Sequence, residues 1–427
     1  MDYLLFAMFA VLLLGGVPIA VALGLAGTLI VALNGLGMMS LPTNVYTGIA
    51  KYPLLAIPMF VLAGLIFERS GVALRLVNLA VALIGNRRGG LAIAAITVCM
   101  VLGGISGSGP ADAAAIATVM IPSMLKAGYP KAFSASVIAA AGSTAILIPP
   151  SIAFILYSIL VPQASIPSLF AAGLIPGILA GLSLMIPAWY FSRKHNFGVA
   201  SSGTVPELWA SFKQAGWGLI TPIIILGGIL SGAFTPTEAA VIAVFYGLFV
   251  GMVVYRSLSW RQLYEVLVES AEISATVLLI IALASVFAWA GSTLGTFDHL
   301  AQWLLGSNGQ SNETMVLLNI TGLILLAGMF LDGISIFFIF LPLLIPIANV
   351  FHWDLVWFGV ILTMNIAIGQ FTPPMAINLM VTSKIAQIRV ESTVPWVLWM
   401  VVSMTASLLL VTFVPELVLF LPRYLGY

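Results

Sequence analysis

Charged side chains are scarce in this chain. Lys, Arg, Asp and Glu make up 7% of the 427 residues, against 61% hydrophobic residues. A soluble domain carries about a quarter charged residues, so the composition excludes an ordinary soluble protein and indicates a polytopic membrane protein in a lipid bilayer. The formal net charge of +1 argues against nucleic acid or a strongly acidic molecule as a partner.

Residues that serve metal and nucleophile chemistry are equally few. The one cysteine, Cys99, stands in an apolar run, where it is expected to be a buried small hydrophobe. The three histidines are expected at the surface. The segment GGISGSG (Gly103–Gly109) has no following Gly-Lys-Ser/Thr, no dinucleotide fingerprint and no nucleophile elbow. The chain is therefore not predicted to be an enzyme.

Long apolar runs predict the membrane spans. Runs long enough to cross a bilayer lie at 3–33, 46–67, 132–160, 169–191, 217–234, 237–255, 268–293, 355–382 and 395–420. Two more runs, 91–125 and 314–349, are interrupted in the middle by Gly-rich segments. Each of these is either a pair of short spans or a re-entrant hairpin.

The second half of the chain repeats the first at an offset of 224 residues. Gly104, Gly109 and Pro122 fall on Gly328, Gly333 and Pro346 without a gap. The pair Pro149–Pro150 falls on Pro373–Pro374, within the spans at 132–160 and 355–382. This register indicates an internal duplication of the kind that many secondary transporters carry.

The positive-inside rule predicts the orientation. With the N-terminus in the cytoplasm, every Lys and Arg except Lys51 and Arg423 falls on the inner side, and the C-terminus falls in the periplasm. The first interrupted run is then flanked by basic residues inside, and the second by Glu313 and Asp354 outside. The two repeats are therefore expected to be inverted relative to each other.

Three further segments are predicted to be short helices or helix starts. Gly71–Gly85 and Phe297–Leu305 precede the two interrupted runs at matching places and are amphipathic. They are expected either as interfacial helices that link two parts of the protein or as ordinary loop helices. Thr235, Pro236 and Glu238 form a capping-box pattern that predicts a helix start.

Small polar residues gather where these helices are interrupted. They are Ser106, Ser108, Ser143, Thr144 and Ser151 in the first repeat, with Ser335, Thr372 and Asn378 in the second. Together with unwound carbonyls near the Pro-Pro pairs, they are oxygen ligands suited to Na⁺, while helix N-termini suit an anion. The alternative is that small residues serve close helix packing.

Two acidic residues lie next to the interruptions. A carboxylate at membrane depth is a functional candidate by default. Asp112 could instead cap the helix that follows Pro110, whereas Asp332, one residue before Gly333, is the better cation-site candidate.

Several motifs together resemble the large membrane (M) subunit of tripartite ATP-independent periplasmic (TRAP) transporters, within the ion-transporter superfamily. The resemblance covers essentially the whole chain, and the run Ser151–Leu179 is most similar to the sialic-acid members. The motifs are PMFVLAGLIFERSG (Pro58–Gly71), GGISGSGPADAAA (Gly103–Ala115), AGYPKAFSAS (Ala127–Ser136), LIPPS (Leu147–Ser151), FTPTEAA (Phe234–Ala240) and GQFTPPMAINL (Gly369–Leu379).

The resemblance implies an all-α elevator-type transporter with inverted repeats, each holding a re-entrant hairpin and a Pro-Pro-broken helix. Residues 91–160 and 307–386 would form the two halves of a transport domain. Residues 1–90, 161–306 and 387–427 would form scaffold helices, with the first arm helix in 1–90 and the linker span and second arm helix in 161–306.

The resemblance also implies two or more Na⁺ ions and one organic anion, most simply sialic acid. One Na⁺ would be held by Ser106, Ser108 and the carbonyls of Ala145, Ile148 and Pro150. The second would be held by Gly328, Gly369, Thr372 and Met375, with Asp332 as a further candidate. Candidate substrate contacts are Ser108, Pro110, Asp112, Ser143, Thr144, Ser335 and Asn378.

The implied partners are a small four-span (Q) subunit and a periplasmic substrate-binding protein, and the implied location is the bacterial inner membrane. A C4-dicarboxylate or another carboxylate is the alternative substrate. Three other functions stay open: a stand-alone Na⁺/dicarboxylate symporter, a structural subunit without transport, and a channel lined by the two hairpins.

Overall fold

The fold is built from helices throughout the part of the chain that the structure, a computed structural model, describes: residues 4–85, 87–198, 207–305 and 312–427. Seven helices there are long and apolar enough to cross a membrane, as predicted for a polytopic membrane protein. They cover Tyr52–Arg69, Ile166–Lys194, Leu208–Leu230, Pro236–Val254, Trp260–Thr293, Gly333–Val350 and Val390–Phe413.

Helix bounds repeat at the predicted offset of 224 residues. Helix α7 (Gly109–Lys126) corresponds residue for residue to α16 (Gly333–Val350). The other matched pairs differ by at most a few residues at their ends. They are α5 (Val72–Ile84) with α14 (Thr296–Leu305), α6 (Gly90–Ser106) with α15 (Glu313–Gly328), α8 (Lys131–Ser143) with α17 (Leu355–Gly369), α9 (Ile152–Leu160) with α18 (Ile377–Ala386), and α10 (Ile166–Lys194) with α19 (Val394–Phe413).

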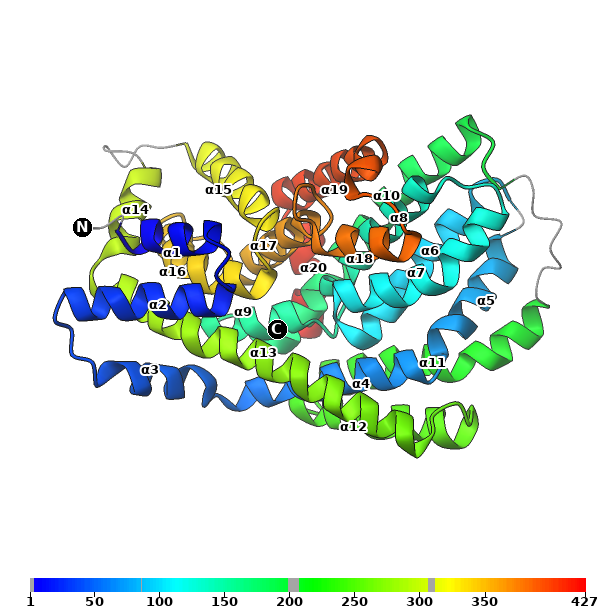
Figure 1. Cartoon of the computed structure of the whole chain (residues 1–427), viewed down its shortest axis with the longest axis horizontal. Helices are drawn as coiled ribbons and strands as arrows, with labels where there is room; N and C mark the ends of the chain where they lie inside the picture. Colours follow the sequence, from blue (N-terminus) through cyan, green and yellow to red (C-terminus); the bar gives the residue numbers. More distant parts are fainter. Residues whose placement is uncertain (1–3, 86, 199–206, 306–311) are drawn as a thin grey trace.

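Both interrupted runs form helical hairpins. Hairpin one consists of α6 and α7 and turns at Gly107 and Ser108, where Gly107 has a φ of +62°. Hairpin two consists of α15 and α16 and turns at residues 329–332. In Figure 1 the two hairpins lie in opposite halves of the molecule. Their tips reach the same cavity in the middle.

The two Pro-Pro pairs interrupt the helices beside these tips. Residues 147–151 separate α8 and the short η2 (Thr144–Ile146) from α9, and residues 370–376 separate α17 from α18. Both Pro-Pro peptide bonds are cis. The broken helices were predicted at these positions because proline removes a backbone donor and disfavours helix in the residue before it.

The prediction of a single first span at 3–33 is wrong. Residues 15–18 (Gly-Gly-Val-Pro) separate α1 (Leu4–Leu14) from α2 (Ile19–Leu33), and the two helices pack against each other. Gly16 has a φ of +81°, and Pro18 cannot donate a helical hydrogen bond, so the chain turns back at this point.

The division of the first span bears on the predicted side of the N-terminus. In Figure 1, α1 begins at the end of the molecule where α2 finishes, and α4 (Ala56–Arg69) finishes toward the opposite end. The predicted cytoplasmic N-terminus depended on one crossing before residue 34, whereas α1 and α2 form a pair that turns back. The side on which the N-terminus lies stays a prediction.

The last predicted span, 395–420, is also divided. Helix α19 ends at Phe413, and α20 (Glu416–Leu425) begins after Pro415. The hydroxyl of Tyr427 donates to the carbonyl of Leu230 at the end of α11 (Leu208–Leu230), 3.1 Å away. The C-terminus therefore lies beside the end of α11, far along that helix from its start at Leu208.

The predicted short helices are present. Helices α5 and α14 occupy the two amphipathic segments before the hairpins. Helix α12 (Pro236–Leu248) begins with the predicted capping box between Thr235 and Glu238, and it continues as η3 (Phe249–Val254). The remaining helical elements before α5 are α3 (Ser40–Ile49) and η1 (Tyr52–Leu55), and η4 (Val390–Thr393) precedes α19.

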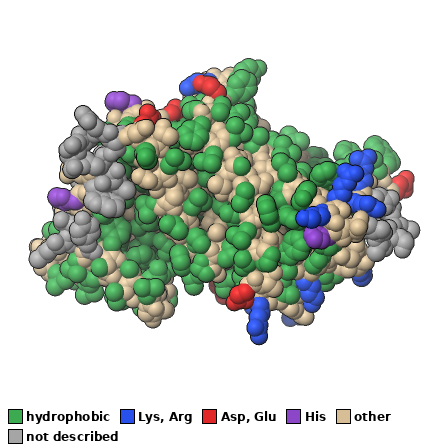
Figure 2. All heavy atoms as spheres, turned by 90° about the horizontal axis from the view of Figure 1, so that it is seen from above, with side chains coloured by type: hydrophobic (Ala, Val, Ile, Leu, Met, Phe, Trp, Pro, Cys, Tyr) green, Lys and Arg blue, Asp and Glu red, His purple; other side chains and the backbone are tan. Residues whose placement is uncertain are grey.

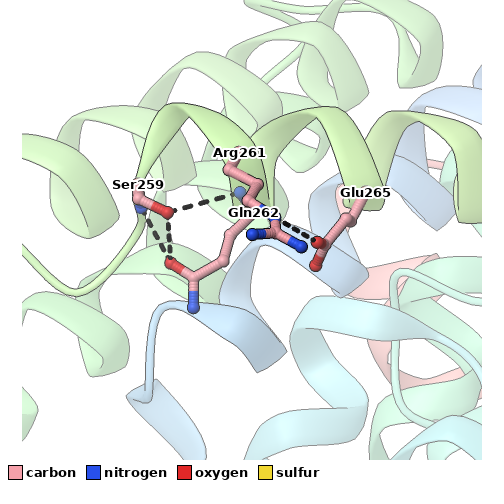
Figure 3. Close-up of polar contacts among 4 residues, drawn as sticks. All are labelled: Ser259, Arg261, Gln262 and Glu265. Carbon is pink, nitrogen blue, oxygen red and sulfur yellow. Dashed lines mark hydrogen bonds and ion pairs between the residues drawn. The ribbon is translucent and has the colours of Figure 1, made fainter.

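Helix α13 (Trp260–Thr293) is the longest helix of the described chain, and it borders the central cavity between the hairpin tips. Ser259 and Gln262 cap its start reciprocally, and Arg261 pairs with Glu265 at 3.3 Å one turn later (Figure 3). The helix packs against α2, α3, α4 and α16. Hairpin two is therefore held against this long helix.

The two repeats are joined by direct contacts between their broken helices. The hydroxyl of Tyr157 in α9 donates to the carbonyl of Leu355 in α17, 2.7 Å away. The ring of Tyr157 lies against Gly359, where an added Cβ would be 2.5 Å from the ring carbon Cε1. Helix α18 of the second repeat packs against α7 and α8 of the first.

We expect Gly359→Ala to destabilise the protein, because the buried and hydrogen-bonded Tyr157 ring leaves no room for a methyl group. Overpacking of this kind costs about 1–3 kcal/mol of unfolding free energy. Gly322→Ala, in α15 where an added Cβ meets no atom within 4 Å, is the matched control and should be neutral or stabilising. Apparent melting temperatures of both purified variants test this. Equal values would contradict the close contact at Gly359.

Candidate functional site

The candidate site is a cavity of about 210 Å³, called here the tip cavity, between the two hairpin tips. Hairpin one contributes Ser106 to Asp112, and hairpin two contributes Asp332 to Ile334. Ile146, Ile152 and Ala153 come from the first broken helix, and Gln370 and Ile377 from the second. Helices α4 and α13 complete the wall, so both repeats and two further helices meet at one place.

Equivalent positions of the two repeats face this cavity. Ser108 and Asp332, Ile146 and Gln370, and Ala153 and Ile377 all line it, and each pair is separated by 224 residues. The same backbone arrangement therefore carries hydroxyl and apolar groups in one repeat and a carboxylate and a carboxamide in the other.

At hairpin one the structure brings together several residues of the first predicted Na⁺ set. Ser106 Oγ donates to Asp112 Oδ1 at 2.6 Å and accepts from the Ser108 amide at 3.2 Å. The carbonyl of Pro150 faces the turn: a Cβ on Gly107 would be 2.4 Å from this oxygen. Only glycine fits at position 107, because of both this contact and its positive φ.

The other two carbonyl candidates of the first set lie deeper. Ala145 packs against Gly103 of α6, where an added Cβ would be 2.6 Å from the Ala145 Cα. The side chain of Ile148 packs against Gly177 of α10. Neither residue lines the tip cavity, in contrast to Ser106, Ser108 and Pro110.

Residues of the second predicted Na⁺ set also lie close together, and most of the contacts involve backbone atoms. Gly328 and Gly369 touch, since a Cβ on Gly369 would be 2.6 Å from the Gly328 Cα. The amide of Met375 donates to the Met329 carbonyl at 3.3 Å. Thr372 Oγ1 donates to the Ile368 carbonyl at 2.6 Å, so its lone pairs stay available to a cation.

The two aspartates make different contacts at the hairpin tips. Asp332 caps α16: it accepts from the amides of Ile334 and Ser335 and from Ser335 Oγ at 2.5 Å. Asp112 is buried and accepts from Ser106 Oγ, while its Oδ2 has no partner among the described residues. The alternative in which Asp112 caps α7 is wrong, because the start of this helix has no side-chain cap. A cation at Asp332 stays a prediction.

The predicted substrate contacts divide into two groups. Ser108, Pro110 and Asp112 line the tip cavity. Ser143 and Thr144 donate to Ala140 and Ala141 within their own helix, and Ser143 lies 3.9 Å from the Met404 sulfur of α19, away from the tips. Ser335 is buried in the cap of α16.

Asn378 links the repeats. Its Nδ2 donates to the Ala139 carbonyl of α8 at 3.2 Å, and its Oδ1 is buried without a donor in the described structure. A Cβ on Gly109 would be 3.3 Å from Asn378 Nδ2 and 2.4 Å from Gln370 Oε1. Both carboxamides therefore surround the start of α7.

The sequence analysis missed Glu68 and Gln370 as cavity residues. Glu68 follows the predicted span 46–67, and an acidic side chain in a loop is not a signal of a site. It does stand within the motif Pro58–Gly71. Gln370 could have been found from the repeat, because its equivalent in the first half is the apolar Ile146. A polar side chain in one repeat at a position that is apolar in the other indicates a functional residue, and only the repeat reveals it.

The tip cavity is acidic. Glu68, Asp112 and Asp332 line it, and none of the described residues that line it is Lys, Arg or His. Asp112 Oδ2 and Gln370 Oε1 are buried acceptors without a donor among the described atoms. Buried acceptors need a partner, and this set of hard oxygens suits a cation better than an anion.

Residues 6–417 match the family described as tripartite ATP-independent periplasmic transporter, DctM component. The isethionate TRAP transporter permease protein DctMQ of Oleidesulfovibrio alaskensis is 40% identical over 97% of this chain, which spans 65% of that protein. The C4-dicarboxylate TRAP transporter large permease protein DctM of Rhodobacter capsulatus is 35% identical over 99% of both chains.

Two further similarities concern substrate and fold. The sialic acid TRAP transporter large permease protein SiaM of Vibrio cholerae is 34% identical over 97% of each chain. Among solved structures, the YdaH transporter of Alcanivorax borkumensis matches with a TM-score of 0.62 at 14% identity, covering 88% of this chain and 87% of the other. At this identity the match shows the shared fold alone.

We expect Asp332→Ala to lower the unfolding free energy by about 1 kcal/mol, because the first turn of α16 loses its cap. Asp332→Asn is the control, since asparagine caps equally well while removing the charge. Apparent melting temperatures of the two variants distinguish the contribution of the cap from that of the negative charge. A loss of stability in Asp332→Asn equal to that in Asp332→Ala would indicate that the charge, and not the cap, holds the hairpin.

Proposed function

The chain belongs to the DctM component family of tripartite ATP-independent periplasmic transporters, and we propose that it carries out Na⁺-coupled uptake of an organic anion by an elevator mechanism. As a large permease of this family it is a multi-pass membrane protein and not an enzyme. The cation, the substrate, the motion and the partners are the parts that we propose.

The acidic lining of the tip cavity carries the proposal of cation coupling. An anion placed beside Glu68, Asp112 and Asp332, with no basic side chain among the described lining residues, would be repelled at membrane depth. Cations bound at the same place remove this repulsion. Ser106 and Ser108 of the first predicted Na⁺ set line the cavity, and their hydroxyl oxygens would serve as ligands for a hard monovalent cation.

The packing supports an elevator as the transport motion. The hairpins and broken helices of both repeats contact one another through Tyr157, Asn378 and α18. They form one body that borders α4 and α13. We propose that this body corresponds to residues 91–160 and 307–386 and moves against the remaining helices. The boundary at 306/307 lies outside the described residues.

Sialic acid remains the proposed substrate on the basis of the run Ser151–Leu179. The related permeases are named for isethionate, C4-dicarboxylates and sialic acid. These compounds share a carboxylate or sulfonate group, so a small organic acid with such a group is the broader proposal.

A small four-span membrane subunit and a periplasmic substrate-binding protein are the proposed partners. The proposed location is the bacterial inner membrane. Most Lys and Arg side chains on the face shown in Figure 2 lie toward one end of the molecule, and we propose that this end faces the cytoplasm. The start of α1 would then be periplasmic.

Uptake of labelled sialic acid into proteoliposomes that contain this chain and its small subunit tests the three-component function. We expect uptake to require both the binding protein and an inward Na⁺ gradient. Uptake without binding protein would instead establish a stand-alone symporter. Uptake driven by a proton gradient in the absence of Na⁺ would replace Na⁺ by protonation of the cavity carboxylates. C4-dicarboxylate and isethionate as competitors test the substrate, and transport of either in place of sialic acid would refute that assignment alone.

We expect Asp112→Asn to raise the Na⁺ concentration for half-maximal uptake about tenfold or more, because a buried charged acceptor is lost. Asparagine keeps the oxygen that accepts from Ser106 Oγ, so the hairpin should fold unchanged. Glu265→Gln removes an exposed carboxylate of α13 and serves as the control. An unchanged Na⁺ dependence in Asp112→Asn, at normal expression, would remove Asp112 from the cation site.

A further inference from the structure

A second cavity, called here the lateral cavity, lies between α5, α6 and α11 and measures about 640 Å³. Leu76, Leu79 and Ala80 of α5 form one wall, and Val98 and Val101 of α6 form the second. The third wall comes from α11, beginning at Leu208 and Trp209. The volume is within the range of small-molecule and cofactor sites.

The lining offers few hydrogen bonds to an occupant. Its polar groups are the hydroxyl of Thr97, whose Oγ1 already donates to the Ile93 carbonyl at 2.9 Å, and the indole N–H of Trp209. Water needs two or more polar partners to be held in a cavity, and an empty apolar space of this size forfeits packing contacts. The fitting occupant is therefore a hydrocarbon chain.

Helices α5 and α11 run antiparallel along the cavity. The start of α5 meets the middle of α11, where a Cβ on Gly218 would be 2.6 Å from Val72. At the other end, Leu83 and Ile84 line the cavity together with Trp209 and Phe212. Trp209 and Phe212 stack with ring centroids 6.0 Å apart, and both are exposed. Aromatic side chains of this kind are typical of the membrane–water boundary.

Basic side chains stand at that end of the cavity. Arg87 and Arg88 stand three and four residues after the end of α5 at Ile84 and are exposed. Lys213 Nζ lies 5.3 Å from the Trp209 ring centroid. None of the three forms an ion pair with any described carboxylate. Arg193 is close to the same loop, because a Cβ on Gly89 would be 3.2 Å from the Cβ of the neighbouring Ser192. Positive charge without an acidic partner at a membrane boundary attracts an anionic headgroup.

We propose that the lateral cavity binds an anionic phospholipid, with one acyl chain between α5, α6 and α11 and the phosphate at Arg87, Arg88 and Lys213. The apolar walls select the chain, and the basic rim selects a negatively charged headgroup over a zwitterionic one.

The position gives this lipid a role in transport. Helix α6 is the first arm of hairpin one, which carries Ser106 at its end, whereas α11 belongs to neither repeat. A chain between them contacts a helix of the proposed moving body and a helix of the surrounding structure. Its presence therefore changes the packing that must rearrange when hairpin one moves.

Quenching of tryptophan fluorescence by lipids with brominated acyl chains tests the proposal. The full chain, with its small subunit, is placed in vesicles of phosphatidylcholine that contain increasing fractions of brominated phosphatidylglycerol, or of brominated phosphatidylcholine as the comparison. The signal of Trp209 is obtained as the difference from Trp209→Phe. We expect Trp209 to be quenched at a roughly tenfold lower fraction of phosphatidylglycerol than of phosphatidylcholine.

The double variant Arg87→Gln/Arg88→Gln should abolish most of that preference, whereas Arg261→Gln, an exposed arginine on α13 paired with Glu265 (Figure 3), should keep it. Val101→Phe fills the cavity and should reduce quenching by both lipids. Equal quenching of Trp209 by the two lipids in the wild type would overturn the proposal. The measurement is repeated without the small subunit. Quenching of Trp209 that appears only in its absence would also overturn the proposal, because a protein helix would then occupy the cavity.

Discussion

The structure depends on how backbone polar groups are satisfied where helices stop in the middle of an apolar fold. Four such interruptions meet at the tip cavity, and in a membrane each free N–H or C=O costs several kcal/mol. Some of these groups form hydrogen bonds with nearby side chains. Ser151 Oγ donates to the Ile146 carbonyl at 2.5 Å, and Asp332 accepts from the first amides of α16. Others, such as the Pro150 carbonyl at Gly107, face neighbouring backbone. The groups that remain unpaired mark the chemistry of the site.

Duplication explains why the two tips are alike in backbone and different in side chains. Close approach of backbone requires small residues at Gly103, Gly328 and Gly369 in both halves. The cavity-facing side chains are free of that requirement, and they differ between Ser108 and Asp332 and between Ile146 and Gln370. An asymmetric solute can therefore be bound by a nearly symmetric frame. The two halves share geometry, and each contributes different ligands.

The sequence was sufficient for features that depend on local chemistry. Glycine and proline positions predicted both hairpins, both broken helices and the 224-residue register, because these residues act on their own backbone. Hydropathy predicted a single span at 3–33, which is wrong, because apolar content does not reveal the turn at Gly16 and Pro18. The cap that Asp332 provides for α16 was not predicted, because a cap depends on side-chain rotamers. Glu68 and Gln370 were missed because their importance comes from tertiary neighbours that no local pattern contains.

The joint between the repeats has a consequence for energy conversion. Tyr157 reaches the Leu355 carbonyl of the other half, and Asn378 reaches Ala139 in the opposite direction. Under the proposed elevator motion, these reciprocal bonds would hold the two halves together as they move. An ion bound in one half would then be carried along with a solute bound in the other.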